Sequence, residues 1–424
     1  MDRCKGIILT CLIGCLSLGP LKAQESMDYQ TVEQSSYALY LSKQWNELLE
    51  LGNKSIENGI DYYYLRLRLG IACYELKHYR AAIPHFKKAL DFSSGDLVAE
   101  EYLYYCYLYS ERKEQAQWLS KSFPASLLTE TSGHKNPMKG SVWTESGVKL
   151  SDSAGIFGPA YFSQLGVSHL VKKRVAVWHV LNWYYQDEDR FDVNQLQYYV
   201  RANLPLKQDW MLSTGIHSFG NASNYTETAV KESTFRPAPP FPGAPDPPVK
   251  TQTVTEVSTI HEQALGIAIA ANLTKHLTLA DVSAGASFLA LDSARQLVAS
   301  LSGIYYPFKN NRLSVGATAY LQKIPGLNGS KVACSPILSC MIGSRLYFSA
   351  SYFRNYGLNI PEQTAYFLNN SVDCTTNRLT LNPIYMINAR WSVYGLYSFE
   401  TKKEIEKNFV YHYQVMVGGL KLNF

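Results

Sequence analysis

The sequence is poor in charge and in cysteines that could form a structural framework. Charged residues make up 18% of the 424 residues, below the ~25% of an average globular protein. The net charge of +5 is spread over 40 basic and 35 acidic side chains, which argues against a nucleic-acid-binding protein. Three of the eight cysteines fall in the first 15 residues, and the other five are widely spaced. This pattern excludes a disulfide framework and a zinc site.

Long apolar runs and catalytic motifs are also missing. Beyond residue 23 there is no stretch of about 18 consecutive apolar residues, so no transmembrane helix is expected. There is no glycine-rich phosphate loop and no nucleophile elbow, and His261-Glu262 lacks the second histidine of a zinc protease. The acidic run 187–189 with Asp192 predicts a solvated loop, with a calcium site as the alternative. We predict no catalytic residue, no metal and no cofactor.

The first residues are typical of an export signal. Arg3 and Lys5 precede the apolar run 6–18, which is too short to span a bilayer and suits a signal peptide. The residues around Ala23 predict cleavage after it, so the signal peptide covers residues 1–23. The alternative is a lipoprotein signal, in which Cys15 is acylated. In both cases the protein leaves the cytoplasm.

The chain is rich in tyrosine, and its N-terminal part contains a helical repeat. The chain has 31 tyrosines, and residues 24–122 show helical periodicity with small residues where two helices would cross. A shift of 34 residues takes Leu69 to Leu103 and Ala82 to Ala116. The residues that define the repeat are Leu69, Gly70, Tyr79, Ala82, Phe86, Ala89, Leu103 and Ala116. The segment resembles a tetratricopeptide repeat, whose period is 34 residues.

The resemblance implies about three repeats, a strong central copy between two degenerate ones, as is usual for terminal repeats. Tyr104 stands where glycine is expected, and Gly52 replaces a large aromatic residue. In that family the inner helices form a groove that holds a protein segment. By the repeat register the groove residues are Tyr64, Leu67, Ile71, Tyr74, Val98, Tyr105, Leu108 and Tyr109. The alternative is that these side chains pack against the protein's own neighbouring domain.

From about residue 141, after a linker over 123–140, the hydrophobic period changes from 3.6 to 2. Apolar and polar residues alternate over 195–206 and again over 312–322. In 264–272 the side chains expected to point inward are small, and leucine and isoleucine point outward. The alternation predicts four lumen-facing side chains, namely Arg201, Asn203, Arg312 and Gln322.

Short basic turns alternate with longer polar loops between the candidate strands. The turns are 172–173, 207–209, 274–276, 309–311, 344–345 and 388–390. The loops are 151–158, 187–193, 222–257, 291–293, 324–330, 358–377 and 401–407. Six turns and seven loops connect 14 strands. This alternation is typical of an outer-membrane β-barrel, which must close so that no backbone group is left unpaired.

The C-terminus agrees with a barrel. Leu420, Leu422 and Phe424 share one face of the last strand, and a terminal aromatic residue there resembles the signal recognised by the barrel assembly machinery. Residues 409–417 alternate one residue out of phase, which predicts a bulge at Gly418-Gly419.

Two loops stand out on the side expected to face the cell exterior. Seven of the 18 prolines fall in 237–248, where an extended polyproline II segment is expected. It would form a spike, a lid over the mouth or a tolerated insertion. Loop 358–377, with Tyr366 and Phe367, is the second candidate for exterior contacts.

Together these features predict an α+β multidomain chain. It comprises a signal peptide (1–23), tetratricopeptide-like helices (24–122), a linker (123–140) and an antiparallel transmembrane β-barrel of about 14 strands (141–424). It is expected in the outer membrane with its helices in the periplasm. The first hypothesis is a non-enzymatic protein whose repeats dock a periplasmic or envelope protein for assembly or export. A conducting export channel for a polysaccharide or small solutes is the alternative, and an outer-membrane hydrolase is the third hypothesis.

The expected partners follow from this location. They are the docked envelope protein, outer-membrane lipid and the barrel assembly machinery, which acts through the C-terminal strand. The balanced charge predicts no nucleic-acid partner.

Overall fold

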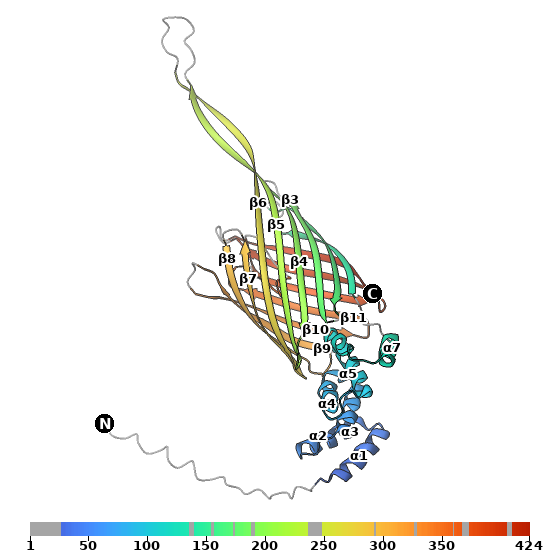
Figure 1. The fold of residues 1–424 in the computed structure, drawn as a ribbon. Coiled ribbons are helices and arrows are strands. Elements are labelled where there is room, and N and C mark those ends of the chain that lie inside the picture. The colour runs from blue at the N-terminus through green and yellow to red at the C-terminus, as the bar shows by residue number, and fades with distance from the viewer. Residues whose placement is uncertain are drawn as a thin grey trace, which may run out of the picture.

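The chain forms a stack of helices followed by a closed β-barrel (Figure 1). The computed structural model describes residues 27–134, 140–153, 157–172, 174–187, 191–235, 248–291, 294–325, 329–358, 360–366, 373–404 and 409–424. The expected signal peptide, residues 237–247 of the proline-rich segment and Phe367 lie outside these ranges.

The helices are α1 (Tyr29–Leu41), α2 (Trp45–Glu57), α3 (Tyr63–Glu75), α4 (Tyr79–Phe92), α5 (Leu97–Tyr109), α6 (Lys113–Leu119) and α7 (Ala125–His134). The first seven strands are β1 (Gly140–Ser151), β2 (Ala160–Val171), β3 (Val175–Asp187), β4 (Phe191–Pro205), β5 (Trp210–Phe235), β6 (Lys250–His276) and β7 (Ala280–Leu291). The last seven are β8 (Ala294–Tyr305), β9 (Leu313–Lys323), β10 (Lys331–Ile342), β11 (Leu346–Asn355), β12 (Cys374–Met386), β13 (Trp391–Lys403) and β14 (Val410–Asn423).

Six of the helices form three hairpins at an interval of 34 residues. The first helices of the hairpins begin at residues 29, 63 and 97, and the second helices at 45, 79 and 113. Each hairpin turns through a left-handed residue, at Lys43, Lys77 and Glu111. Each turn repeats the same two backbone hydrogen bonds, which in the first hairpin run from Gln44 N to Leu39 O and from Lys43 N to Tyr40 O. This is the Schellman arrangement that ends helices, so the backbone repeats with the same period as the sequence.

The repeat-defining residues lie where these helices touch. Those that are buried are Leu69, Gly70, Ala82, Phe86, Ala89, Leu103 and Ala116, whereas Tyr79 is partly exposed. A Cβ at Gly70 would lie 2.6 Å from Cε1 of Phe86. Gly52 faces Leu69 in the same way, because a Cβ at Gly52 would lie 2.4 Å from Cδ2 of Leu69. Larger residues at these two glycines would force the helices apart.

The predicted linker contains a further helix, α7, and this corrects its expected extent. Leu127 of α7 is buried against the helical stack. Pro124 and Gly133 mark the segment as a loop by composition, but Leu128 N donates to Pro124 O at 3.0 Å. Pro124 therefore sits at the start of the helix, where its missing N–H costs nothing.

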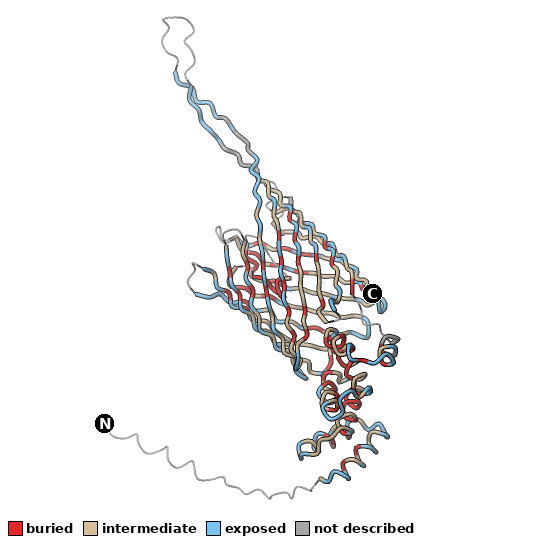
Figure 2. The backbone as a smooth tube through the Cα atoms, viewed as in Figure 1, coloured by how far each residue is buried: buried red, intermediate tan, exposed pale blue. Residues whose placement is uncertain are grey.

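The 14 strands close into one antiparallel barrel, in which each strand pairs with its neighbours in the chain and β1 pairs with β14. The predicted strand number is confirmed. We call the end with the six short turns the turn end and the opposite end the loop end. Figure 2 shows buried residues concentrated between the helices and scattered along the barrel wall.

The outer surface of the barrel is apolar in the middle and aromatic towards both ends. Leu265 is 81% exposed on this surface, and Leu196, Ile216 and Leu301 are exposed there too. Exposed aromatic residues near the loop end are Tyr161, Trp183, Tyr352 and Phe399. Those near the turn end are Tyr305, Tyr385, Trp391 and Phe424.

Several predicted connections are wrong in extent, most clearly those at 274–276 and 222–257. β6 runs to His276, so the turn predicted at 274–276 lies at 277–279. Most of the loop predicted at 222–257 is strand, because β5 and β6 pair without interruption out to Phe235 and Lys250. The paired segments project beyond the barrel as a two-stranded ribbon (Figure 1). Threonine and valine, which favour strands, are frequent in this segment.

The bulge predicted at Gly418-Gly419 is absent. β14 pairs with β13 and with β1 without a register shift. Tyr411, Tyr413 and Val415 are buried on the inner face, and Leu420 and Phe424 are exposed on the outer face. The apolar residues change face along the strand because the lumen itself accepts aromatic side chains near the loop end.

Candidate functional site

The inward side chains of the barrel enclose a cavity of about 2880 Å³. Its wall comes chiefly from β1–β4 and β12–β14, and Leu108, Glu111 and Glu114 of the helical stack line its turn end. Uncharged polar side chains are prominent in this wall, among them Gln164, Gln195, Gln197, Ser349, Ser351, Thr380 and Asn382. The cavity is therefore a large, water-compatible space inside a closed sheet.

The connection between β11 and β12 folds into the barrel, which corrects the prediction that it makes exterior contacts. We call its described residues, 356–358 and 360–366, the lumen loop. Ile360 is buried in a cluster with Val298, Tyr320, Ala333 and Phe353. Ala365 is buried in a second cluster with Phe219, Ala268, Ala270 and Leu289. These wall residues belong to β5 through β11. The lumen loop therefore packs against the part of the wall that contributes least to the cavity.

Polar side chains from several strands hold the lumen loop in place. Four hydrogen bonds run from Tyr199 Oη to Thr364 O (3.0 Å), from Asn272 Nδ2 to Thr364 Oγ1 (2.8 Å), from His217 Nδ1 to Ala365 O (2.8 Å) and from Gln164 Nε2 to Tyr366 Oη (2.7 Å). Glu362 adds a buried ion pair, because Arg378 Nη2 lies 2.7 and 2.8 Å from its two carboxylate oxygens. The loop is anchored to the wall at both polar and apolar positions.

The lumen loop is also strained. Its residues Gln363, Thr364 and Ala365 have φ of 49°, 62° and 62°. The left-handed conformation costs about 1–2 kcal/mol for each residue other than glycine, and it persists only where the surroundings enforce it. Gly215 of β5 makes room for this turn, because a Cβ there would lie 2.1 Å from Thr364 O. The loop therefore depends on its anchors and on a glycine in the opposite wall.

Charged and aromatic side chains combine on the cavity side of the lumen. Lys149 Nζ lies 3.1 Å from a carboxylate oxygen of Glu400 and 4.3 Å from the ring centroid of Tyr413. Phe157 stacks on Tyr411, with ring centroids 4.2 Å apart. This wall presents both polar groups and flat apolar faces to whatever occupies the cavity.

Arg80 of α4 fixes the helical stack to the turn end of the barrel. Its side chain is 1% exposed. Nη2 donates to Leu277 O at 2.9 Å and Nε to Thr278 O at 3.2 Å, and the guanidinium pairs with Asp281. The guanidinium carbon also lies 3.8 Å from the ring centroid of Tyr306. One arginine thus joins the β6–β7 and β8–β9 connections to the helices.

A second set of contacts joins the helices to Asp209 in the β4–β5 turn. Lys87 Nζ donates to Asp209 Oδ2 at 2.8 Å, and Arg112 Nη1 lies 3.7 Å from Oδ1. Burial and the neighbouring Arg80 guanidinium lower the pKa of Arg112. Nearby, Asn203 Nδ2 donates to Glu114 Oε1 at 3.1 Å. These contacts place α6 and the α5–α6 turn under the barrel.

The predicted groove residues do not form one open surface. Tyr64 and Val98 are exposed and Ile71 is buried, while the half-buried members are Leu67, Tyr74, Tyr105, Leu108 and Tyr109. The Tyr74 ring packs edge-on against Tyr79 and Tyr102, with centroids 5.4 and 5.0 Å away. Leu108 and Tyr109 line the lumen cavity. Part of the predicted groove therefore faces the barrel, as in the alternative interpretation.

The predicted lumen-facing residues lie in three different places. Gln322 is buried beside the lumen loop, where its Nε2 donates to Leu358 O at 3.2 Å. Asn203 is buried near the helices, and Arg201 Nε donates to its Oδ1 at 3.0 Å. Arg312 is an exposed residue in the turn before β9. Within the described ranges, no group of three or more His, Cys, Asp or Glu side chains is placed to hold a metal.

No family model matches the chain, and neither does any curated protein. Among solved structures, the Ralstonia pickettii toluene transporter TbuX aligns with a TM-score of 0.42 and 11% identity, over 68% of this chain and 90% of that one. A Pseudomonas aeruginosa FadL homologue gives 0.41 and 11%, over 68% and 90%. The KdgM porin gives 0.31 and 9%, over 66% and 99%. With TM-scores below 0.5, these similarities assign neither a family nor a function.

Sequence reasoning missed two features of this site. Gly215 is a weak sequence signal for the inward course of the lumen loop, because a glycine within a strand can mark the close approach of another segment. Arg80 has no such signal, since its partner Asp281 lies 201 residues away in the chain. The structure describes no helix that is long and apolar enough to cross a membrane.

Proposed function

We propose that the protein is an outer-membrane channel whose lumen is narrowed by the lumen loop. The observation that carries this proposal is the cavity of about 2880 Å³, which lies inside a closed barrel and reaches the helical stack at one end. A barrel of 14 strands falls between eight-stranded barrels, which are filled by side chains, and porins of 16–18 strands, which hold an aqueous channel.

The outer surface supports a location in the outer membrane. An outward apolar band between two aromatic girdles matches a lipid bilayer and its two interfaces. Outer-membrane barrels keep short turns on the periplasmic side and longer loops outside. The helical stack at the turn end would then lie in the periplasm, and the β5–β6 ribbon would project from the cell. The glutamine, serine, threonine and tyrosine side chains of the cavity suit small polar solutes.

Single-channel conductance in planar bilayers tests this proposal, with the chain lacking residues 1–23. Gly215→Ala should push the lumen loop away from the wall, because the new Cβ would collide with Thr364 O. Gly303→Ala is the matched control, since a Cβ there has no atom within 4 Å. We expect wild-type conductance that rises roughly twofold in G215A, as a wider lumen lowers the barrier to ions, and no change in G303A.

Silence from both the wild type and G215A would overturn the channel, provided that each shows the heat-modifiable migration of a folded barrel. Equal conductance of G215A and wild type would remove the loop from the proposal and leave the channel in place.

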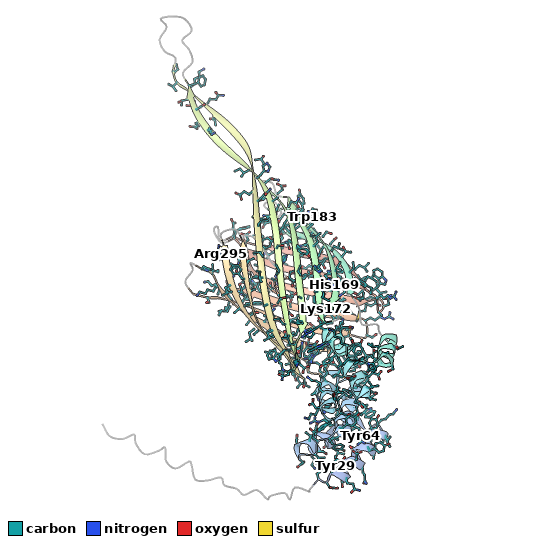
Figure 3. The ribbon with its side chains drawn as sticks, in the orientation of Figure 1. Tyr29, Tyr64, His169, Lys172, Trp183 and Arg295 are labelled. Carbon is teal, nitrogen blue, oxygen red and sulfur yellow. The ribbon has the colours of Figure 1, made fainter. Side chains whose placement is uncertain are left out.

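A second candidate function is docking of an envelope protein by the helical stack. It rests on the three-hairpin architecture, which is similar to tetratricopeptide repeats, and on the exposed rings of Tyr29, Tyr37 and Tyr64. The guanidinium carbon of Arg68 lies 5.0 and 5.7 Å from the Tyr37 and Tyr64 ring centroids. Figure 3 shows Tyr29 and Tyr64 at the end of the stack farthest from the barrel. Rigid aromatic side chains are effective anchors because they bury a large area with few torsions to freeze.

A photo-crosslinking residue at position 64 tests docking in intact cells, with the exposed Lys54 position as control. Docking predicts a discrete adduct at 64 that disappears when Tyr37 is changed to alanine. Adducts of equal yield at 54 and 64 would contradict a specific site. Tyr74→Ala is unsuitable because its ring packs within the stack.

A further inference from the structure

We propose that the channel opens at its turn end through a side portal between the α5–α6 turn and the β10–β11 and β12–β13 turns, and that this portal favours anions. The proposal deepens the channel function and rests on it. It concerns where a solute leaves the lumen and which charge it carries.

The helical stack is fixed to one part of the rim. The hydrogen bonds and ion pairs described above reach the turns 206–209 and 277–279, the start of β7 and the connection 306–312. Within that last connection, Asn310 Nδ2 donates to Lys77 O at 3.0 Å. These connections follow β4, β6 and β8 in the barrel order. Arg174 of the β2–β3 turn also contacts the stack, since its guanidinium carbon lies 4.9 Å from the ring centroid of Trp118 in α6. The stack therefore covers the turn end from the side of β2 to β9.

The two remaining turns, β10–β11 and β12–β13, line the same cavity as the stack. Glu111 of the α5–α6 turn and Lys113 at the start of α6 line the lumen cavity, and so do Ser344 and Arg345 of the β10–β11 turn. Residues 387–390 of the β12–β13 turn line it as well. Because one continuous cavity has both the stack and these two turns in its wall, the opening lies between them.

Basic side chains are in excess around this opening. Lys113, Arg345, Arg390 and Lys421 line it, against Glu111 and Glu114. Lys113 Nζ lies 3.0 Å from a Glu111 oxygen, so these two charges offset each other. Arg345, Arg390 and Lys421 then stand against Glu114, which accepts a hydrogen bond from Asn203. Arg345 and Arg390 are exposed, and no described side chain forms an ion pair with them. Charges at the mouth of a narrow, low-dielectric pore raise the local concentration of the opposite ion.

A competing account of the same arginines is attraction to anionic lipid head groups, which acts on basic residues near a membrane surface. The chain offers a matched control. Lys172 and Lys207 are also exposed basic residues in short turns, but they do not line the cavity. Figure 3 labels Lys172 on the barrel. Charge reversal at these lysines changes the rim charge by the same amount as reversal at the two arginines.

The test is the reversal potential of the full channel in a gradient of potassium chloride. Wild type should pass chloride in preference to potassium. R345E/R390E should lower the chloride-to-potassium permeability ratio by roughly threefold through the loss of local anion enrichment, and R345Q/R390Q should lie between. K172E/K207E should match wild type.

Three outcomes are distinguishable. An unchanged permeability ratio in R345E/R390E overturns the portal while leaving the channel intact. An equal change in K172E/K207E also overturns it, in favour of a general effect of rim charge. Absence of conductance from wild type and G215A is the failure of the channel itself.

Discussion

The guanidinium of Arg80 in α4 forms an ion pair with the carboxylate of Asp281 at the start of β7. The carboxylate is held from two further sides, by Tyr306 Oη at 2.8 Å and by His276 Nδ1 at 2.9 Å. Arg80 in turn donates to the Leu277 and Thr278 carbonyls. Because the arginine side chain is 1% exposed, these contacts join the helical stack and the barrel away from solvent.

Arg80→Met should loosen the helical stack from the barrel. Removing one partner of a buried pair typically costs about 3–5 kcal/mol, because the other charge is left uncompensated. We expect faster hydrogen exchange at residues 277–281 and at α4. Arg66→Met is the control, since Arg66 pairs with Asp61 within the stack at 2.6 Å. Exchange at 277–281 that is the same in R80M and wild type would contradict the role of Arg80.

Glu362→Gln should release the lumen loop. Arg378 would then lose the two carboxylate oxygens that its Nη2 contacts, and the strained residues 363–365 would lose one of the anchors that hold them. We expect larger and noisier single-channel currents than in wild type. Glu262→Gln removes the same charge from the cavity wall at a position outside the loop. An identical current change in both variants would assign the effect to charge alone.

The helical stack should lose stability as the pH falls from about 6.5 to about 4. Burial and the adjacent Arg66 lower the pKa of His85 to about 4, and Arg66 Nη1 lies 3.3 Å from His85 Nδ1. Between these pH values the unfolded chain binds a proton that the folded stack does not, so the free energy of unfolding decreases. His85→Gln should reduce this decrease, because glutamine stays neutral and still accepts from Arg66.

Thermal unfolding followed by helical circular dichroism, at about pH 7 and about pH 4.5, measures the effect. His261→Gln is the control, because His261 is exposed on the barrel ribbon. The same loss of Tm on acidification in H85Q and wild type would contradict a contribution from His85.

Local periodicity was enough to predict most of the fold. Leu69 and Leu103 are 34 residues apart, which is the interval at which the helical hairpins repeat. The alternation over 195–206 predicts which side chains face outward, and Leu196 and Tyr198 are exposed there while Gln195 and Gln197 are buried. Such patterns are readable because each is set by neighbours within one or two turns or strands. The full length of β5 and β6 was not predicted, because the residues that continue these strands beyond the rim are polar and resemble a loop in composition.

By itself the sequence determined the succession of helices and strands, the number of strands and the side of each strand that faces outward, since these depend on backbone period and solvent preference. Only the tertiary structure decided that residues 360–366 turn into the lumen against Gly215, that Arg80 joins the two parts of the chain, and which residues line the cavity. The physical reason is that these features rest on contacts between residues more than 100 positions apart. Folding brings such residues together, and no local sequence pattern indicates which residues will meet.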